Sequence, residues 1–278
     1  MQPPVISRFV LAFFRNTARR YFRRHFHAVR LSGADQLAAQ AKPLLVYANH
    51  SSWWDPMVAT LLAEQLLPGR RHYAPMDAAS LERYRILKKI GIFPVEMATA
   101  RGAVQFLRTG EAVLRSGGVL WVTPEGRFVD ARERPRSFKP GLAGLAVRVA
   151  PCTVQPLAIE YVFWDERLPE CLLRLGKPVQ VAAGESAEAV EARLVAALEG
   201  TMDELRELAL TRSNAGFTVL ERGALGVGGA YGLGKRLWAA LRGQPYAAEH
   251  TAAAAVAQAA VAPRPEPIAI PTEEHGNA

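Results

Sequence analysis

A histidine and an aspartate stand five positions apart at His50 and Asp55, within the run NHSSWWDP of residues 49–56. A continuous helix would separate these side chains by roughly 140° around its axis, so only a turn brings them together. In a turn, the Asp55 carboxylate can hold one imidazole nitrogen and leave the other as a general base. Such a base contributes about 10² to 10⁴ in rate. The spacing therefore predicts proton abstraction by His50, with Asp55 orienting the ring.

The flanking residues indicate how this turn is held. Residues 44–47 are apolar and predict a buried strand, while Asp55 and Pro56 are typical of an N-cap and a first helical position. His50 is then expected where a strand ends, just before a helix. The plainer alternative is that Asp55 only caps the helix and His50 is a polar turn residue.

Further along the chain, apolar runs of strand length alternate with helix-like segments. This order is typical of an α/β fold with a mainly parallel central sheet flanked by helices, whose working loops lie at the carboxyl ends of the strands. The turn Pro124–Arg127 follows such a strand and can therefore meet His50 at one edge. Strands are expected at 72–75, 92–95, 119–122, 154–161 and 172–175, and helices at 57–67, 81–90, 99–114, 142–149 and 186–210.

Composition favours one main domain with appendages. The chain has 278 residues, half of them apolar, which is enough for one sizeable core. We place this domain at residues 31–212, a possible surface helix at 213–242 and a disordered Ala/Pro-rich tail at 243–278. The two cysteines, Cys152 and Cys171, form no CxxC pair, which favours a reduced compartment and neither a disulfide scaffold nor a metal site.

The positive charge is concentrated at the N-terminus. Of the 34 Lys and Arg residues, seven lie in residues 1–30, which contain no acid; the other 27 face 26 Asp and Glu. A helical wheel places the aromatic residues of this segment on one side and several arginines on the other, with no window apolar enough to span a bilayer. We expect a basic amphipathic helix over residues 1–30 that holds the protein peripherally on an anionic membrane, at its cytoplasmic face. The wheel places Ile6, Phe9, Val10, Phe13, Phe14 and Tyr21 on the apolar side, opposite Arg8, Arg15, Arg19 and Arg23.

Two other interpretations of this N-terminal segment remain open. A helix packed on the domain's own core would show a similar apolar face. A nucleic-acid-binding arm would interleave aromatic and basic residues, whereas here the phenylalanines form a face of their own, so no nucleic-acid partner is expected.

Three motifs in order carry a family resemblance. With residues 49–56, the turn Pro124–Arg127 and the run Phe138–Gly141, the sequence resembles the glycerolipid acyltransferase family, whose best-known members are the 1-acylglycerol-3-phosphate acyltransferases. The resemblance covers roughly residues 30–210. It implies that His50 deprotonates an acceptor hydroxyl, that Asp55 orients it, and that an acyl group moves from acyl-CoA or acyl carrier protein. No metal or prosthetic cofactor is implied.

The resemblance also implies an acceptor-binding set made of Glu125, Gly126, Arg127, Arg101 and Lys139. In the family, a Pro-Glu-Gly turn is followed one residue later by an arginine and a small hydroxyl residue; here Arg127 follows Gly126 directly and Phe128 comes next. A second family arginine is expected near residues 96–97, where this chain has Glu and Met, and Arg101 is the nearest base. Guanidinium groups at such positions suit an acceptor phosphate.

These patterns predict an O-acyltransferase that acts on a lysophospholipid or related lipid acceptor. A non-phosphate acceptor, such as an aminolipid or a glycosylated lipid, stays open because of the shifted arginines. A non-catalytic lipid-binding protein would keep the fold without the chemistry. A thioester hydrolase is a further alternative, although the chain has no GxSxG elbow.

Overall fold

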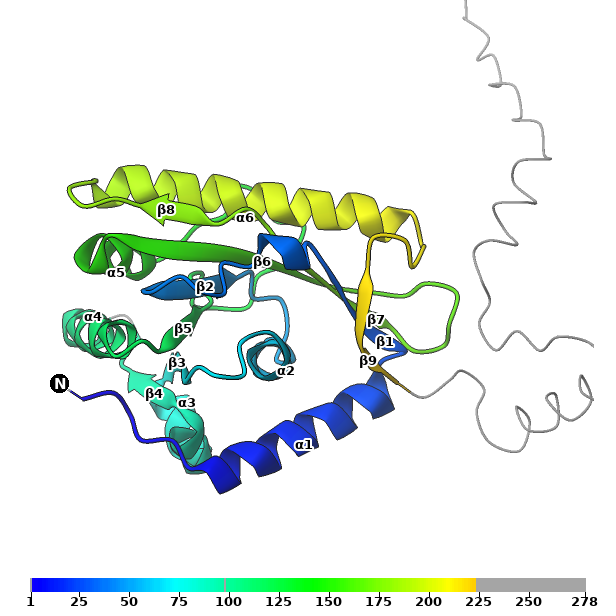
Figure 1. Ribbon diagram of the computed structural model, residues 1–278, viewed down its shortest axis with the longest axis horizontal. Helices are drawn as coiled ribbons and strands as arrows, with labels where there is room; N and C mark the ends of the chain where they lie inside the picture. The colour runs from blue at the N-terminus through cyan, green and yellow to red at the C-terminus, as the bar shows by residue number, and fades with distance from the viewer. Residues whose placement is uncertain (1, 98, 224–278) are drawn as a thin grey trace, which may run out of the picture.

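The computed structural model describes residues 2–97 and 99–223, and its strands form one sheet between two layers of helices (Figure 1). In spatial order the strands of the described chain are β4 (Ile92–Val95), β3 (His72–Asp77), β5 (Val119–Val122), β2 (Leu44–Ala48), β6 (Cys152–Val162), β7 (Glu170–Leu175), β1 (Ala28–Ser32) and β9 (Thr218–Arg222), with β8 (Val179–Val181) paired to β6. The five successive strands from β4 to β6 run parallel, as do β7 and β1, whereas β6–β7, β6–β8 and β1–β9 are antiparallel. The mainly parallel α/β fold predicted from the sequence is confirmed.

Helices cover both faces of the sheet. On one face lie α4 (Ala100–Arg115), α5 (Gly141–Val149) and α6 (Ala187–Leu210); on the other lie α1 (Arg8–His25) and α2 (Asp55–Leu66) (Figure 1). The helices pack on the sheet through apolar faces. In α6 this face consists of residues that recur at helical spacing and are all buried: Val190, Leu194, Leu198 and Leu205. Each such leucine stabilises the fold by about 1.5–3 kcal/mol. The short helices η1 (Ala34–Gln36), α3 (Ala78–Arg83) and η2 (Arg85–Ile90) lie in connections.

The parallel strands direct several loops to one edge. The carboxyl end of β2 leads to His50, the end of β5 leads to the turn at Pro124, and the end of β4 leads to Met97. Strand β6 pairs with β2 up to Leu157 and then continues to Val162, so its last residues reach past the end of β2. The candidate residues from distant parts of the chain therefore share one edge of the sheet.

Helix α1 is shorter than expected and packs by a different face. It ends at His25, and its Ala18 and Phe22 are buried against the domain. Arg19, expected on the free basic side, pairs with Glu64 at 3.3 Å instead, and Arg15 is half-buried. The packed-helix interpretation is therefore correct for one face. The outward face carries Phe9, Phe13, Arg20 and Arg24.

The expected N-terminal segment also includes a strand. Residues 28–32 form β1, in which Arg30 is 2% exposed and donates to Glu170 at 2.9 Å. Arg30 is therefore an interior ion-pair partner, and the expectation of a helix and a surface arginine there is wrong. No helix of the described chain has the length and apolar character needed to cross a bilayer.

Two further segments differ from the sequence prediction. Residues 81–90 were expected as one helix but form the end of α3 and then η2, and Gly91 with a positive φ of 98° closes η2. Residues 218–222, expected within a possible helix at 213–242, are strand β9, paired with β1. The remaining part, 224–242, and the tail 243–278 lie outside the described residues.

Candidate active site

The turn between β2 and α2 brings His50 and Asp55 into contact. His50 Nδ1 lies 2.7 Å from Asp55 Oδ2. Asp55 is the first residue of α2 rather than its cap, since Trp54 occupies the N-cap position. Its carboxylate points back into the turn and accepts the Ser52 amide hydrogen at 3.0 Å. The structure thus gives the pair the arrangement that the five-residue spacing predicts.

The two side chains differ in access to solvent. The His50 side chain is 18% exposed, whereas the Asp55 side chain is 2% exposed. The buried carboxylate accepts a second contact on its other oxygen, because the Tyr161 hydroxyl donates to Oδ1 at 2.6 Å. With Ser52 donating to the oxygen that faces His50, the network assigns the imidazole proton to Nδ1. The Nε2 lone pair is then the one available to a substrate.

The backbone of His50 is held from both sides by the loop after β5. Its N–H donates to Glu125 Oε2 at 2.9 Å, and its C=O accepts the Val129 N–H at 2.8 Å. One residue earlier, the buried Asn49 amide bonds the N–H and the C=O of Ile159 on β6. These bonds fix the position of His50 at the sheet edge independently of its ring.

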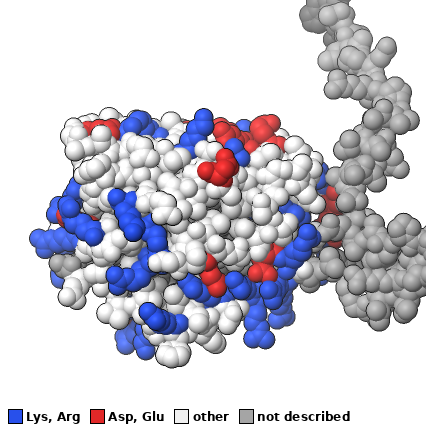
Figure 2. Space-filling model, viewed as in Figure 1, with Lys and Arg blue, Asp and Glu red and all other residues white. Residues whose placement is uncertain are grey.

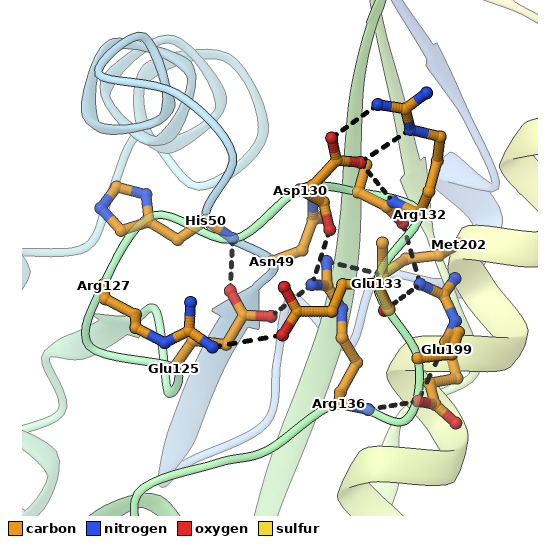
Figure 3. Close-up of polar contacts among 12 residues, drawn as sticks. Asn49, His50, Glu125, Arg127, Asp130, Arg132, Glu133, Arg136, Glu199 and Met202 are labelled. Atoms are coloured by element: carbon orange, nitrogen blue, oxygen red, sulfur yellow. Dashed lines mark hydrogen bonds and ion pairs between the residues drawn. The ribbon is translucent and has the colours of Figure 1, made fainter.

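Glu125 belongs to a buried ion pair. Its Oε1 lies 3.1 Å from Arg136 Nη1, and both side chains are at most 1% exposed (Figure 3). Burial raises the pKa of Glu125, against the opposing effect of the Arg136 cation, and burial lowers the pKa of Arg136. The Arg136 guanidinium also donates to the Asp130 carbonyl at 3.1 Å. The Glu125 carboxylate, predicted to bind substrate, thus faces the protein's own groups and positions His50.

Gly126 lets other loops approach the turn. Its φ of 64° is left-handed, and a Cβ there would lie 2.7 Å from Lys139 Cε and 2.9 Å from Met97 Cε. The Lys139 N–H donates to the Pro124 carbonyl at 2.8 Å. The structure therefore brings Lys139 and the loop after β4 to the same turn, while leaving Lys139 exposed.

The two candidate arginines lie differently. Arg127 is 63% exposed and its guanidinium contacts Glu133 at 3.2 Å (Figure 3). Arg101 is exposed on the first turn of α4, and within the described chain no hydrogen bond or ion pair joins it to the other predicted site residues. Of the expected acceptor-binding residues, Lys139 and Arg127 therefore lie together at the turn after β5, whereas Arg101 lies apart from them on α4.

An aromatic ring covers part of the His50 side chain. Phe128 is 57% exposed, and its ring centroid lies 4.4 Å from that of His50. This contact places apolar surface beside the imidazole. Around the pair, the described residues contain no cluster of three or more His, Cys, Asp or Glu side chains that could hold a metal ion.

Three of the residues that hold the pair were missed in the sequence. Asn49 and Tyr161 act across long sequence separations: Ile159 is 110 positions after Asn49, and Tyr161 is 106 positions after Asp55. Arg136 was one of several arginines in a charged loop. The one available signal was position, since Asn49 precedes the histidine and Tyr161 ends a predicted strand.

Comparisons with known proteins agree with this geometry. The model of a family described as acyltransferase matches residues 28–160, which include His50, Asp55 and Glu125. No curated protein sequence matches the chain. A similar solved structure is that of the 1-acyl-sn-glycerophosphate (LPA) acyltransferase PlsC from Thermotoga maritima, with 19% identity, a TM-score of 0.53 and coverage of 72% of this chain and 80% of that one.

The matched region includes the His50–Asp55 pair and the Pro-Glu-Gly turn and ends within β6. The shared fold places the same kind of strands and helices around it. Over residues 28–160 the chain is therefore similar to the acyltransferase family, and it shares its fold with a 1-acyl-sn-glycerophosphate acyltransferase.

Proposed function

We propose that the protein transfers a fatty acyl group from acyl-CoA or acyl carrier protein to the hydroxyl of a lysophospholipid or related lipid, with His50 as the general base. The observation that carries this proposal is the 2.7 Å contact between His50 Nδ1 and a buried Asp55 carboxylate. It leaves Nε2 as the basic nitrogen on the more exposed side of the pair.

In the proposed step, His50 Nε2 removes the proton of the acceptor hydroxyl as the oxygen attacks the thioester carbonyl. The new carbon–oxygen bond forms, the carbon–sulfur bond breaks, and the leaving thiolate takes the proton from the imidazolium. Asp55 stabilises that imidazolium and holds the ring. No acyl-enzyme is required, so Ser51 and Ser52 are not assigned a nucleophilic role.

The acceptor class follows from the cations beside the turn. Lys139 and Arg127 lie at the turn whose Glu125 accepts a hydrogen bond from the His50 backbone. A guanidinium can bind a phosphate through paired hydrogen bonds. Glu133 holds Arg127 in the structure, and a phosphate would compete with that carboxylate. A phosphorylated lysolipid is therefore the proposed acceptor. The apolar ring of Phe128 beside His50 favours the second candidate, a lysolipid without the phosphate.

An acceptor comparison separates the two candidates. The protein is assayed with labelled acyl-CoA and either lysophosphatidic acid or a monoacylglycerol, and the products are identified. We expect Arg127→Ala to lower kcat/KM about 10-fold to 100-fold for lysophosphatidic acid, because a charge-assisted hydrogen bond is lost, and to have little effect for the monoacylglycerol.

The matched control is Glu133→Gln, which frees Arg127 from its carboxylate and should not lower the rate with the phosphorylated acceptor. An equal loss with both acceptors would contradict phosphate binding by Arg127. Labelled free fatty acid as the product would indicate a hydrolase, and binding without turnover would indicate a non-catalytic lipid-binding protein.

The proposed acceptor is a membrane lipid, and one surface of the fold suits a bilayer. Five large apolar side chains, each more than half exposed, lie on the N-terminal segment and at the start of η2; we call them the docking surface, and they are Val5, Phe9, Phe13, Tyr84 and Ile86. The Ser7 N–H donates to the Lys89 carbonyl at 2.8 Å, which ties the two segments together.

Cations surround the docking surface. Arg8, Arg83, Arg85 and Lys89 are exposed beside it, and Lys and Arg side chains gather along the lower edge of the molecule in Figure 2, over α1 and α3. Glu82 offsets part of this charge by pairing with Arg85. Aromatic side chains with flanking cations are typical of proteins that lie in the interface of an anionic membrane. We therefore propose peripheral attachment through this surface.

Vesicle binding tests the attachment. The variant with Phe9→Ser and Phe13→Ser is expected to bind vesicles containing phosphatidylglycerol about 10-fold more weakly for each phenylalanine removed, because each buries apolar area in the interface. The control replaces Phe163 and Leu210 with serine; both are about two-thirds exposed but lie near the carboxyl end of α6. Equal loss in both variants, or none in the first, would contradict the proposed docking surface.

A further inference from the structure

Tyr161 is the next-to-last residue of β6, and its hydroxyl contacts the Asp55 carboxylate. The hydroxyl donates to Asp55 Oδ1 at 2.6 Å, which is short for a neutral donor and typical of a bond to a charged oxygen. Asp55 Oδ2 is occupied by His50 and by the Ser52 amide. Tyr161 is therefore the partner of the one carboxylate oxygen that His50 does not contact.

The fold holds the tyrosine rigidly. Its ring lies 5.7 Å from that of Phe26, at the end of α1, and Tyr161 pairs across the sheet with the buried Cys171 on β7. Burial, with smaller contributions from Cys171 and Asp55, raises the pKa of Tyr161 well above its usual value. The hydroxyl therefore stays protonated and remains a donor over the whole working range of pH.

A carboxylate on a short side chain can rotate about its last torsion, a broad and soft one. Rotation of Asp55 would move Oδ2 away from Nδ1 and release the imidazole from its tautomer and orientation. A second donor on Oδ1 prevents this rotation by fixing the plane of the carboxylate. In hydrolases with a His–Asp pair, a wrongly oriented or wrongly protonated imidazole costs large factors in rate although the base is present.

We infer that Tyr161 is a positioning residue for acyl transfer, completing a Tyr161–Asp55–His50 chain in which the tyrosine orients the carboxylate and the carboxylate orients the base. This inference rests on the proposed function of the pair. Tyr161 is proposed to act through Asp55 and is assigned no part in binding substrate.

The test compares two tyrosines whose hydroxyls donate inside the domain. Tyr161→Phe removes only the hydroxyl and keeps the ring packing. Tyr47→Phe is the matched control, because the Tyr47 hydroxyl also donates, at 2.8 Å, but to the Leu194 carbonyl on α6. Tyr47 is fully buried and Tyr161 partly buried, so both variants are expected to lose thermal stability, Tyr47→Phe at least as much as Tyr161→Phe.

Only Tyr161→Phe is expected to lose activity. Its kcat should fall about 10-fold to 100-fold, the factor expected for a hydrogen bond to a charged group, with the KM for acyl-CoA and for the lysolipid within about twofold of wild type. Tyr47→Phe should keep its kcat. A kcat for Tyr161→Phe that matches wild type, or an equal fall in both variants, would overturn the inference.

A double-variant cycle shows whether the tyrosine acts through Asp55. In an Asp55→Asn background, adding Tyr161→Phe should cost less than about threefold, since the carboxylate that it positions is already gone. A full multiplicative loss would overturn the inference while leaving the catalytic pair in place. Wild-type transfer by Asp55→Asn alone would contradict the proposed function itself, and the inference with it.

Discussion

Replacing His50 with alanine is expected to lower kcat/KM for acyl transfer by about 10² to 10⁴, because the acceptor hydroxyl then loses its general base. Substrate binding should change little, since the imidazole is proposed to act on a proton and not to hold either substrate. The fall should therefore appear in kcat, with KM nearly constant. The measurement is release of CoA thiol in the presence of the lysolipid, at saturating concentrations of each substrate.

Two companion variants make the result specific. Asp55→Asn keeps the size of the side chain but presents an amide to His50 Nδ1, so it should also lose activity. Ser51→Ala is the control, as a neighbouring residue in the same turn that has no assigned nucleophilic role, and it should keep the wild-type rate. Activity that survives in His50→Ala but disappears in Ser51→Ala would indicate a serine nucleophile instead.

Replacing Arg136 with methionine is expected to give the largest loss of stability. The substitution removes the partner of Glu125 while leaving that carboxylate buried, with its side chain 1% exposed. Breaking a buried pair in this way typically costs about 3–5 kcal/mol, which corresponds to a fall of about 6–20 °C in Tm for a domain of this size. Thermal unfolding followed by circular dichroism measures it.

The loss of stability in Arg136→Met is expected to increase with pH. Burial holds the pKa of Glu125 above its usual value of 4.5 in the folded state, and loss of Arg136 raises it further. Below pH 4.5 the carboxyl is protonated in both the folded and the unfolded chain, so the variant should be least destabilised there. The loss should grow as the pH rises through the raised pKa.

The control for Arg136 is a second variant in which the charge is removed as well. Glu125→Gln combined with Arg136→Met leaves an amide oxygen that can still accept the His50 N–H, and it should recover most of the stability. Arg132→Met, at an exposed pair with Asp130, should change Tm little. A Tm for Arg136→Met close to wild type would contradict the stabilising role of the Glu125–Arg136 pair.

The parts of the fold that follow from local pattern could be predicted. The apolar run before Asn49 forms β2, and the two long segments predicted as helices form α4 and α6. The alternation of strands and helices along the chain gives a mainly parallel sheet. The contact between His50 and Asp55 also followed from local sequence, because five residues in a turn are enough to bring the two together. These features depend on neighbours in the chain.

The features that were predicted wrongly, or not at all, depend on residues that are distant in the sequence. Arg30 looked like one more charge of a basic helix, since nothing near it in sequence shows that Glu170 neutralises it inside the sheet. Strand β9 forms by pairing with the edge of β1, so its strand conformation depends on a segment far away in the sequence. Tyr161 has the same origin, because its role depends on β6 extending past β2 toward Asp55. Pairings of this kind have no signature in a single sequence.

Following the acyl label in wild type and in His50→Ala distinguishes direct transfer to a hydroxyl activated by His50 from transfer through an acyl-enzyme. Each protein is mixed with labelled acyl-CoA, first without and then with lysophosphatidic acid, and the label is located on protein, fatty acid and lipid. We expect no label on the protein, diacyl lipid formed only with the acceptor and in amounts equal to the thiol released, and almost none with His50→Ala. Label bound covalently to the protein, or equal lipid formation by His50→Ala, would rule out direct transfer with His50 as the base.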